Sequence, residues 1–155
     1  MTILRNNLTL AITMVSVFIL DHLSKLYVSH FFSSGQSIPI VKGIFHLTFL
    51  ENPGAAFGLF PNQQLFFILV SVVSLFFISL YLVKTSKLLR FLQVALGLIA
   101  GGILGNLIDR VSNGLVVDFF DFRVWPVFNL ADSAIVLGVA LLLFGFLRKQ
   151  QVGKD

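Results

Sequence analysis

Carboxylate side chains are the residues of this sequence with the clearest potential for chemistry. Asp118 follows a run of Leu and Val residues, and Asp132 stands shortly after Asn129 at the start of an apolar stretch. A carboxylate can serve as an acid or a base, but isolated aspartates in loops are more often simply solvated. Asp132 has another ordinary interpretation, because an aspartate at a helix N-terminus compensates the helix dipole. These residues alone leave a catalytic and a structural role open.

A second polar group combines an aspartate and a lysine. Asp21 and Lys25 are four residues apart, so they share one face of a helix and are expected to pair. Charged groups inside a membrane span cost roughly 2.5–3.5 kcal/mol each, and less near an interface. The pair either anchors the helix end by snorkelling to the interface or supports a functional site, and we assign it a supporting role.

A stripe of glycines leads to a third polar group. Gly97, Gly101 and Gly105 recur every four residues, a spacing that lets helix backbones approach closely. The same spacing continues to Asp109, with Asn106 one turn before it. Helix packing explains the glycines but does not explain the two polar residues at the end of the stripe.

Other catalytic schemes fit the sequence less well. Ser24 and Lys25 are adjacent and therefore point about 100° apart on a helix, which argues against a serine–lysine pair. The three histidines fall in the first span or the segment after it, without metal-ligand spacing, and are interpreted as interfacial. The chain contains no cysteine, which excludes disulfides and thiolate chemistry. We expect neither a metal nor a cofactor.

The elements that must position these residues lie in a membrane. Of 155 residues, 57% are hydrophobic and 12% charged, against roughly 25% charged in soluble domains. The 11 basic residues are dispersed without a recognition motif, so nucleic-acid binding is not expected.

Four continuous apolar stretches are each long enough to span a bilayer as a helix, and they lack the alternation of barrel strands. They cover about residues 8–28, 65–83, 88–108 and 130–147. The first resembles a secretory signal, but no small-residue cleavage site follows, and we interpret it as a retained span.

The fold class expected is therefore an all-α integral membrane protein with a small β-hairpin on its outer side. Residues 1–155 form a single membrane domain, with outer segments at 29–64 and 109–129. Residues 44–51 alternate with a period of two, and Gly43 supplies a turn, which predicts a hairpin over residues 38–51. The second outer segment combines the turn signal Asn113–Gly114 with aromatics suited to a membrane interface.

The basic residues predict the orientation. An even number of spans puts both termini on one side, and seven of the 11 basic residues fall there: Arg5, Lys84, Lys87, Arg90, Arg148, Lys149 and Lys154. The positive-inside rule makes this side cytoplasmic. Six of the seven acidic residues fall at or beyond the outer helix ends, the exception being Asp155. Chemistry that needs carboxylates is thus expected near the outer face.

Five segments of the chain resemble, in order and spacing, the motifs of the lipoprotein signal peptidase (signal peptidase II) family. They are residues 21–25 (DHLSK), 52–58 (NPGAAFG), 101–110 (GGILGNLIDR), 114–119 (GLVVDF) and 128–133 (FNLADS). Ser24 and Pro53 differ from the usual residues in ways that leave the acidic positions intact. The resemblance covers nearly the whole chain from Asp21 to the fourth span.

The resemblance implies an intramembrane aspartic endopeptidase of the bacterial cytoplasmic membrane. The catalytic pair would be Asp118 and Asp132, and the substrate a prolipoprotein cleaved before a diacylglyceryl-modified cysteine. The residues expected to support the pair or bind substrate are Asn52, Gly54, Asn106, Arg110, Asn129, Asp21 and Lys25. Besides this substrate, membrane lipid is the partner expected, and the protein is expected to be a monomer.

Elementary electrostatics is consistent with that implication. Two carboxylates about 4 Å apart repel by about 4 kcal/mol at an effective dielectric of about 20, so they share one proton near neutrality. The sequence does not say which aspartate is protonated. The substrate's acyl chains would stay in the bilayer, and we expect residues 38–51 and 119–125 to flank a lateral entrance.

Two other classes of function are considered. A small transporter or proton-coupled channel would also carry intramembrane carboxylates, but it predicts polar residues through the full membrane depth. Here they crowd the outer third, and the second span offers only Ser71, Ser74 and Ser79. A non-catalytic scaffold, whose aspartates merely keep loops soluble, is the third class.

Overall fold

The computed structural model describes residues 7–54, 63–85 and 88–152, with no side-chain detail for residues 149–152. Motif residues 55–58 lie outside these ranges, as do Arg5, Lys87, Lys154 and Asp155 of the charge count. The elements, in chain order, are α2 (Leu8–Phe31), β1 (Ser37–Val41), β2 (Phe45–Asn52), α3 (Gln64–Lys84), α4 (Arg90–Asn113), β3 (Val116–Asp121) and α5 (Leu130–Val152).

The four expected spans are confirmed as helices. Within the described ranges, four helices are long and apolar enough to cross a membrane. α4 runs on to Asn113 rather than ending near residue 108, so Asp109 and Arg110 belong to the helix and not to the outer segment. Gly114 ends α4 in a left-handed conformation with φ 76°, which glycine adopts without strain, and its N–H bonds the carbonyl of Arg110 at 3.1 Å.

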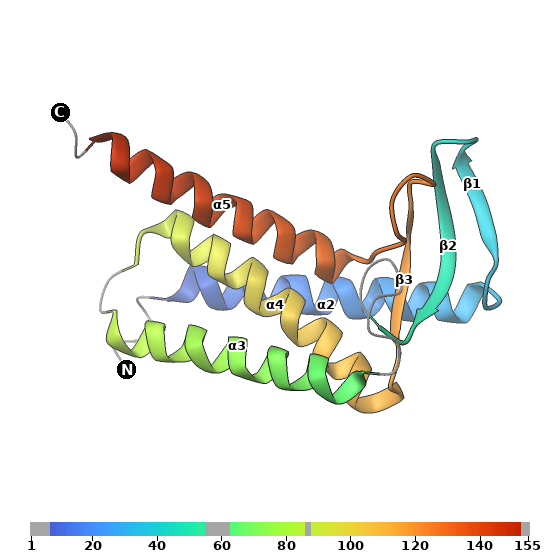
Figure 1. Ribbon diagram of the computed structural model, residues 1–155, viewed down its shortest axis with the longest axis horizontal. Helices are drawn as coiled ribbons and strands as arrows, with labels where there is room; N and C mark the ends of the chain where they lie inside the picture. Colours follow the sequence, from blue (N-terminus) through green and yellow to red (C-terminus); the bar gives the residue numbers. More distant parts are fainter. Residues whose placement is uncertain (1–6, 55–62, 86–87, 153–155) are drawn as a thin grey trace.

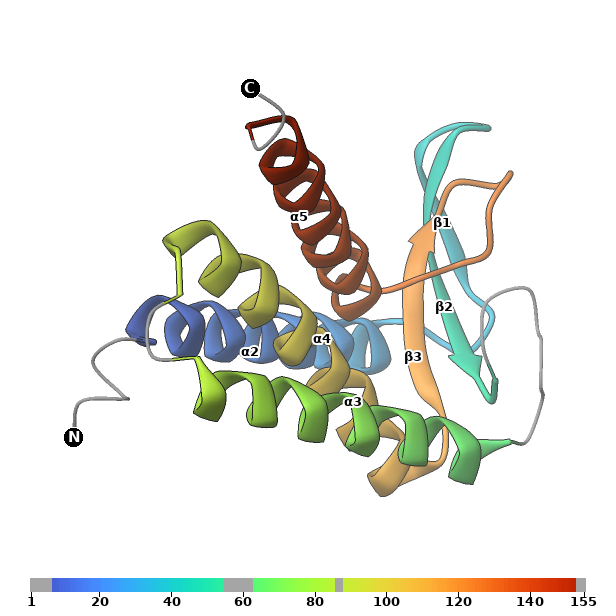
Figure 2. The ribbon, with the colours of Figure 1, turned by 60° about the vertical axis from the view of Figure 1, so that its left-hand side comes forward.

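The helices form a bundle whose one end is covered by a small sheet (Figure 1). α3 and α5 lie on opposite sides of α4, as both views show (Figures 1 and 2), and α2 packs against α4 and α5. α2 begins and α5 ends at the end of the bundle away from the sheet (Figure 1). No described residue of α3 is buried, so this helix presents apolar side chains on all sides, as a lipid-exposed span does.

The glycine stripe packs α4 against α2, as its spacing predicts. A Cβ at Gly97 would come within 2.8 Å of Leu10 O, and one at Gly101 within 2.6 Å of Met14 O. Gly102 instead faces Ala131 on α5. α4 is therefore the central helix, and its small residues bring α2 and α5 close enough to share polar contacts.

The expected hairpin is confirmed, and a third strand joins it. β1 and β2 pair antiparallel around the turn at Gly43, and β3 pairs antiparallel with β2, giving the order β1-β2-β3. The expectation for residues 109–129 included interfacial aromatics but no strand. β3 lies nearest the helices, and Phe49 and Phe119 pack with Val28 at the end of α2 (Figure 2). The sheet is thereby fixed to the helical bundle at the end where α5 begins.

Candidate active site

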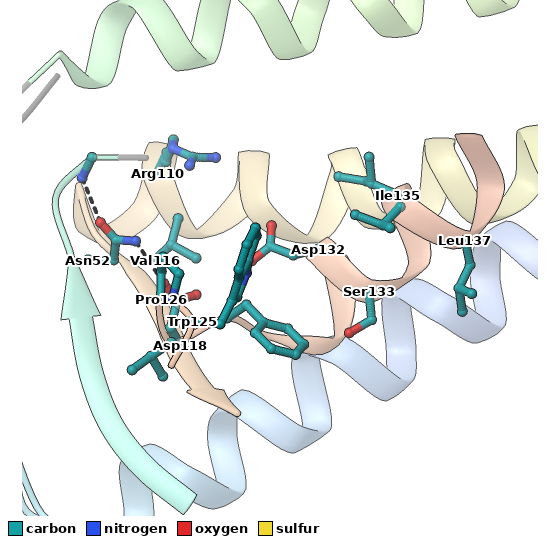
Figure 3. A pocket seen from close by; sticks show the side chains of 14 residues that line it. Asn52, Arg110, Val116, Asp118, Trp125, Pro126, Asp132, Ser133, Ile135 and Leu137 are labelled. Carbon is teal, nitrogen blue, oxygen red and sulfur yellow. Dashed lines mark hydrogen bonds between the residues drawn. The ribbon is translucent and has the colours of Figure 1, made fainter. Parts of the chain in front are cut away.

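Asp118 lies on β3 with only 2% of its surface exposed. Its Oδ2 accepts a hydrogen bond from Asn52 Nδ2 at 2.7 Å, where β2 ends, and its Oδ1 accepts one from Asn129 Nδ2 at 2.7 Å. Asn52 Oδ1 in turn accepts the backbone N–H of Gly54 at 2.9 Å. The sheet therefore supplies both the aspartate and one of the amides that hold it (Figure 3).

Asp132 lies in the first turn of α5 and is half-buried. It forms a reciprocal capping box with Asn129: Asn129 Oδ1 accepts the N–H of Asp132 at 2.9 Å, and Asp132 Oδ2 accepts the N–H of Asn129 at 3.3 Å. Its other oxygen, Oδ1, accepts a hydrogen bond from Asn106 Nδ2 at 2.8 Å. The cap interpretation from sequence is thus correct for Asp132, and the same residue also has a carboxylate oxygen bonded to α4.

Asn129 joins the two aspartates. Its side chain is fully buried and bonds the carboxyl of Asp118, the backbone of Asp132 and Oδ1 of Asn106, the last at 3.1 Å. Asp118 and Asp132 also line one pocket of about 670 Å³ (Figure 3). Residues 14 positions apart in the sequence are therefore brought into one site by the contact between β3 and the start of α5.

The environment of Asp118 raises its pKa to about 7. Burial is the main cause because it disfavours the charged form, and the neighbouring carboxylate of Asp132 adds to the effect. The hydrogen bonds from Asn52 and Asn129 act in the opposite direction without cancelling it. A carboxyl that exchanges its proton near neutrality is suited to acid–base chemistry.

Lys25 is buried inside the protein and does not snorkel. Its ammonium lies 2.7 Å from Asp21 Oδ2, 2.8 Å from Asp109 Oδ2 and 3.0 Å from Asn106 Oδ1, with 3% of the residue exposed. The expected Asp21–Lys25 pair is present, but the possibility that it anchors the helix end at the interface is wrong.

Gly105 makes room for the Asp21–Lys25 pair, because a Cβ there would overlap the Asp21 carboxylate. Asp21 also caps α5, since its Oδ1 accepts the N–H of Ala131 at 2.8 Å.

The structure separates the buried carboxylates near this end of the helices into two kinds. Asp21 and Asp109 share Lys25 as their ion-pair partner, and neither lines the pocket. Asp118 and Asp132 have no basic side chain within ion-pair distance among the described contacts, and both face the pocket.

Asp121 is a further aspartate on β3. Its carboxylate accepts hydrogen bonds from Thr48 and Arg123, and it does not line the pocket.

The remaining expected residues also lie at the site. Arg110 and Gly54 line the pocket. The guanidinium of Arg110 stacks on Phe67, with Cζ 4.9 Å from the ring centroid, and donates to Asn106 O at 3.4 Å. This stacking helps to hold the cation in place, and Figure 3 shows Arg110 at the pocket wall.

Much of the pocket wall is apolar and was not identified from the sequence. Among the described residues, the hairpin contributes only its last residue, Asn52, so the expectation that residues 38–51 flank an entrance gains no support, whereas Trp125 does line the pocket. The outward face of α5 forms another part of the pocket wall. A hydropathy pattern cannot distinguish these side chains from side chains that face lipid. The residues not anticipated are Val116, Pro126, Val127, Phe128, Ser133, Ile135, Val136 and Leu137.

Comparison with known proteins agrees with the geometry. A family model described as signal peptidase (SPase) II matches residues 13–148. Lipoprotein signal peptidase of Halothermothrix orenii is 46% identical over 142 residues, covering 92% of this chain and 97% of that protein. The corresponding protein of Clostridioides difficile is 48% identical over 125 residues, covering 79% and 84%.

Solved structures give the same result for the fold. A bacterial membrane enzyme determined by the in meso method at 2.3 Å resolution superposes with a TM-score of 0.86 at 32% identity, covering 92% of this chain and 89% of that one. A second, at 1.9 Å resolution, gives a TM-score of 0.81 at 33% identity, covering 90% and 92%.

Proposed function

Because this chain belongs to the signal peptidase II family, we propose that Asp118 and Asp132 are the catalytic pair with which it cleaves its substrate. It is a multi-pass bacterial membrane protein and an aspartic endopeptidase that removes the signal peptide from prolipoproteins. The observation that supports the pair is the contact of both aspartates with the single buried residue Asn129, beside one pocket.

The pair acts with one proton between its two carboxyls. The ionised carboxylate takes a proton from a water molecule, whose oxygen attacks the scissile carbonyl carbon. The protonated carboxyl donates its proton to the carbonyl oxygen and so stabilises the tetrahedral intermediate. On collapse of the intermediate the C–N bond breaks, and the carboxyl that took the proton from water gives it to the leaving nitrogen. The proton on the former carbonyl oxygen returns to the other aspartate, so the products are a carboxylic acid and an amine and the pair again holds one proton. No covalent bond to the protein forms.

The substrate class follows from the family and fits the walls of the pocket. The proposed substrate carries a diacylglyceryl group on the cysteine after the scissile bond. The pocket continues from the aspartates along Ile135, Val136 and Leu137 of α5, which present an apolar surface beside the carboxyls (Figure 3). An acyl chain that remains in the bilayer can lie against such a surface while the peptide reaches the aspartates. Asn52, Gly54 and Arg110 line the polar part of the pocket and hold the peptide backbone.

The site is proposed to lie near the outer face of the membrane, with both termini cytoplasmic. Among the described residues, Lys84, Arg90 and Arg148 lie at the helix ends away from the sheet, and the positive-inside rule places that end in the cytoplasm. The sheet and the aspartates then lie on the outer side, where a signal peptide emerges after translocation.

The central helix α4 offers no continuous polar path of the kind that a transport function requires. Between Gln93 and Asn106, α4 carries only aliphatic residues and glycine. The carboxylates of the described chain gather at the sheet end, whereas ion pathways through a membrane need polar groups along their length.

Two precursor peptides, one lipid-modified on the cysteine and one unmodified, test this function. Purified protein is expected to cleave the modified peptide before that cysteine and to leave its twin intact, as read by mass spectrometry. Equal cleavage of both, or cleavage at another bond, would contradict the proposed substrate. The same assay applied to Asp118→Asn and Asp132→Asn tests the catalytic pair.

A further inference from the structure

The orientation of the Asn106 amide is set by a residue that does not touch the pocket. Lys25 carries only N–H donors, so the atom of Asn106 that lies 3.0 Å from its Nζ must be the oxygen. The Asn106 NH₂ group consequently points the other way, to Asp132 Oδ1 at 2.8 Å. A carboxylate oxygen that faces a fixed N–H donor is stabilised in its charged form.

The Asn129 amide is fixed by the same kind of constraint. Its Oδ1 accepts the backbone N–H of Asp132, so its NH₂ group must face Asp118 Oδ1 and Asn106 Oδ1. Asn106 Oδ1 is therefore held from two sides, by a charged donor from α2 and a neutral donor at the start of α5. The charged donor makes the stronger bond.

The two aspartates nevertheless differ in where they lie. Asp132 stands in the first turn of a long helix, where unpaired N–H groups and the helix dipole favour negative charge, and its Oδ2 accepts one of those N–H groups. Asp118 stands on a strand, is almost fully buried, and its carboxyl accepts the side-chain amides of Asn52 and Asn129 rather than a backbone N–H of the helix. A protonated Asp118 still has lone pairs for the amides of Asn52 and Asn129.

We propose that Lys25 is a positioning residue of this peptidase, which fixes the Asn106 amide so that Asp132 carries the negative charge and Asp118 carries the catalytic proton. The inference rests on the proposed function of the two aspartates. It assigns Asp132 as the base that takes the proton from water and Asp118 as the acid that protonates the scissile carbonyl.

The charged groups around the pair come from two helices. α2 contributes Lys25 and Asp21, and α4 contributes Asp109 and Arg110, while β2 faces Asp118 with the neutral amide of Asn52. The effect of the Asn106 amide must therefore be separated from the through-space effect of the lysine charge.

A double variant makes that separation. Lys25→Met with Asp109→Asn removes one positive and one negative charge, so the cluster keeps the parent's net charge and no second carboxylate is left without a partner. Lys25→Arg keeps a donor-only cation, and Asp109→Asn alone keeps the lysine. In each protein, kcat/KM for the lipid-modified precursor peptide is measured across pH.

In the double variant the Asn106 amide loses its charge-assisted hydrogen bond from Lys25, and the loss of this fixed donor disfavours ionised Asp132. The acid limb of the kcat/KM profile is therefore expected to move up by about one pH unit. Lys25→Arg and Asp109→Asn are expected to show no upward shift of that limb. An unchanged acid limb in the double variant, or an upward shift in Asp109→Asn equal to that of the double variant, would overturn the role of Lys25.

Infrared spectroscopy tests the assignment without any change at Lys25. Below pH 7, where Asp118 is protonated, the band of a protonated buried carboxyl is expected to disappear in Asp118→Asn and to remain in Asp132→Asn. The opposite pattern would overturn the assignment. If both asparagine variants are inactive while the double variant keeps the parent profile, only this inference fails; if either asparagine variant cleaves normally, the proposed catalytic pair itself fails.

Discussion

Asn129 is the residue on which the geometry of the site most depends. Its fully buried side chain caps α5, holds the carboxyl of Asp118 and contacts Asn106. Amides suit this position because each offers a donor and an acceptor without adding charge to a buried pair of carboxyls. The asparagines thus keep the two aspartates close despite their mutual repulsion.

Replacement of Asp118 by asparagine is predicted to change how stability depends on pH. The folded protein keeps the Asp118 proton up to about pH 7, whereas the unfolded chain releases it near the ordinary pKa of an aspartate, 3.8. The folded state therefore binds more protons in this window, and the parent loses stability as the pH rises through it. Asp118→Asn lacks this loss, so relative to the parent it gains roughly 3–4 kcal/mol between about pH 4 and pH 8. Thermal unfolding in detergent micelles measures the difference.

Asp121→Asn is the matched control, with the opposite sign. Burial alone would raise the pKa of Asp121, but hydrogen bonds from Thr48 and Arg123 hold it below the usual value. Its contribution to stability is present above the unfolded pKa and is lost as the pH falls through the folded one. This variant is expected to lose stability relative to the parent at neutral pH. Parallel curves for the parent and Asp118→Asn would show that Asp118 is not buried in the way described.

The aspartates and most of their partners could be selected from the sequence, but their contacts could not. Asp118, Asp132 and the asparagines stand in recognisable motifs. Whether Lys25 turns outward or inward depends on the neighbouring helix, where Gly105 leaves room for the Asp21 carboxylate. An i, i+4 spacing specifies the pair but carries no information about the third helix that it faces.

At the scale of the elements, α4 determines the spacing of the other helices. Its glycines bring the backbones of α2 and α5 so close that Asp21 on α2 can cap the first turn of α5. In lipid there is no hydrophobic force between apolar helices, so close packing and such polar contacts hold the spans together. The active site is a consequence of this packing, because α2, α4 and α5 each contribute to the polar network.

Gly101→Ala is predicted to destabilise the protein by separating α2 from α4. The new Cβ would lie 2.6 Å from the Met14 carbonyl oxygen and 2.8 Å from Val17 Cβ. Overpacking of this kind costs about 1–3 kcal/mol, which exceeds the roughly 1 kcal/mol that alanine gains over glycine in helix propensity. A lower melting temperature in detergent is the expected result. Val111→Ala, on an exposed part of the same helix, is the control, and equal melting of Gly101→Ala and the parent would contradict the packing.

The helices and the hairpin could be predicted, whereas β3 could not. Continuous apolar runs identify spans because each is long enough to cross the hydrocarbon core as a helix, and the alternation in residues 44–51 is that of a strand with two different faces. β3 has no such alternation, since buried residues occur on both of its faces. Its aromatics were therefore interpreted as interfacial, and its pairing with β2 depends on contacts distant in sequence.

At the scale of the whole molecule, the two ends of the bundle differ in chemistry. The described carboxylates and the asparagines of the site lie at the sheet end, and the helix ends at the opposite side carry Lys84, Arg90 and Arg148 without a described carboxylate. This separation is the basis of the proposed orientation, in which a lipid-anchored substrate meets the site at the outer surface.

Cysteine labelling is predicted to show that orientation directly, because the chain has no cysteine of its own. Gln36→Cys, just before β1, is expected to react with a membrane-impermeant thiol reagent on intact cells. Lys84→Cys, at the end of α3, is expected to react only after the membrane is opened. The reverse pattern would place the sheet in the cytoplasm.

Single-turnover cleavage of the lipid-modified precursor by Asp118→Asn and Asp132→Asn tests the account most directly, with Asp121→Asn as the control for an aspartate of the same strand outside the pocket. Asparagine keeps the shape of each side chain but cannot exchange the required proton. Both pocket variants are predicted to fold with the parent's helical content and to lose cleavage by at least about 10³-fold, whereas Asp121→Asn cleaves at a rate near that of the parent. Near-normal cleavage by either folded pocket variant would contradict the catalytic pair.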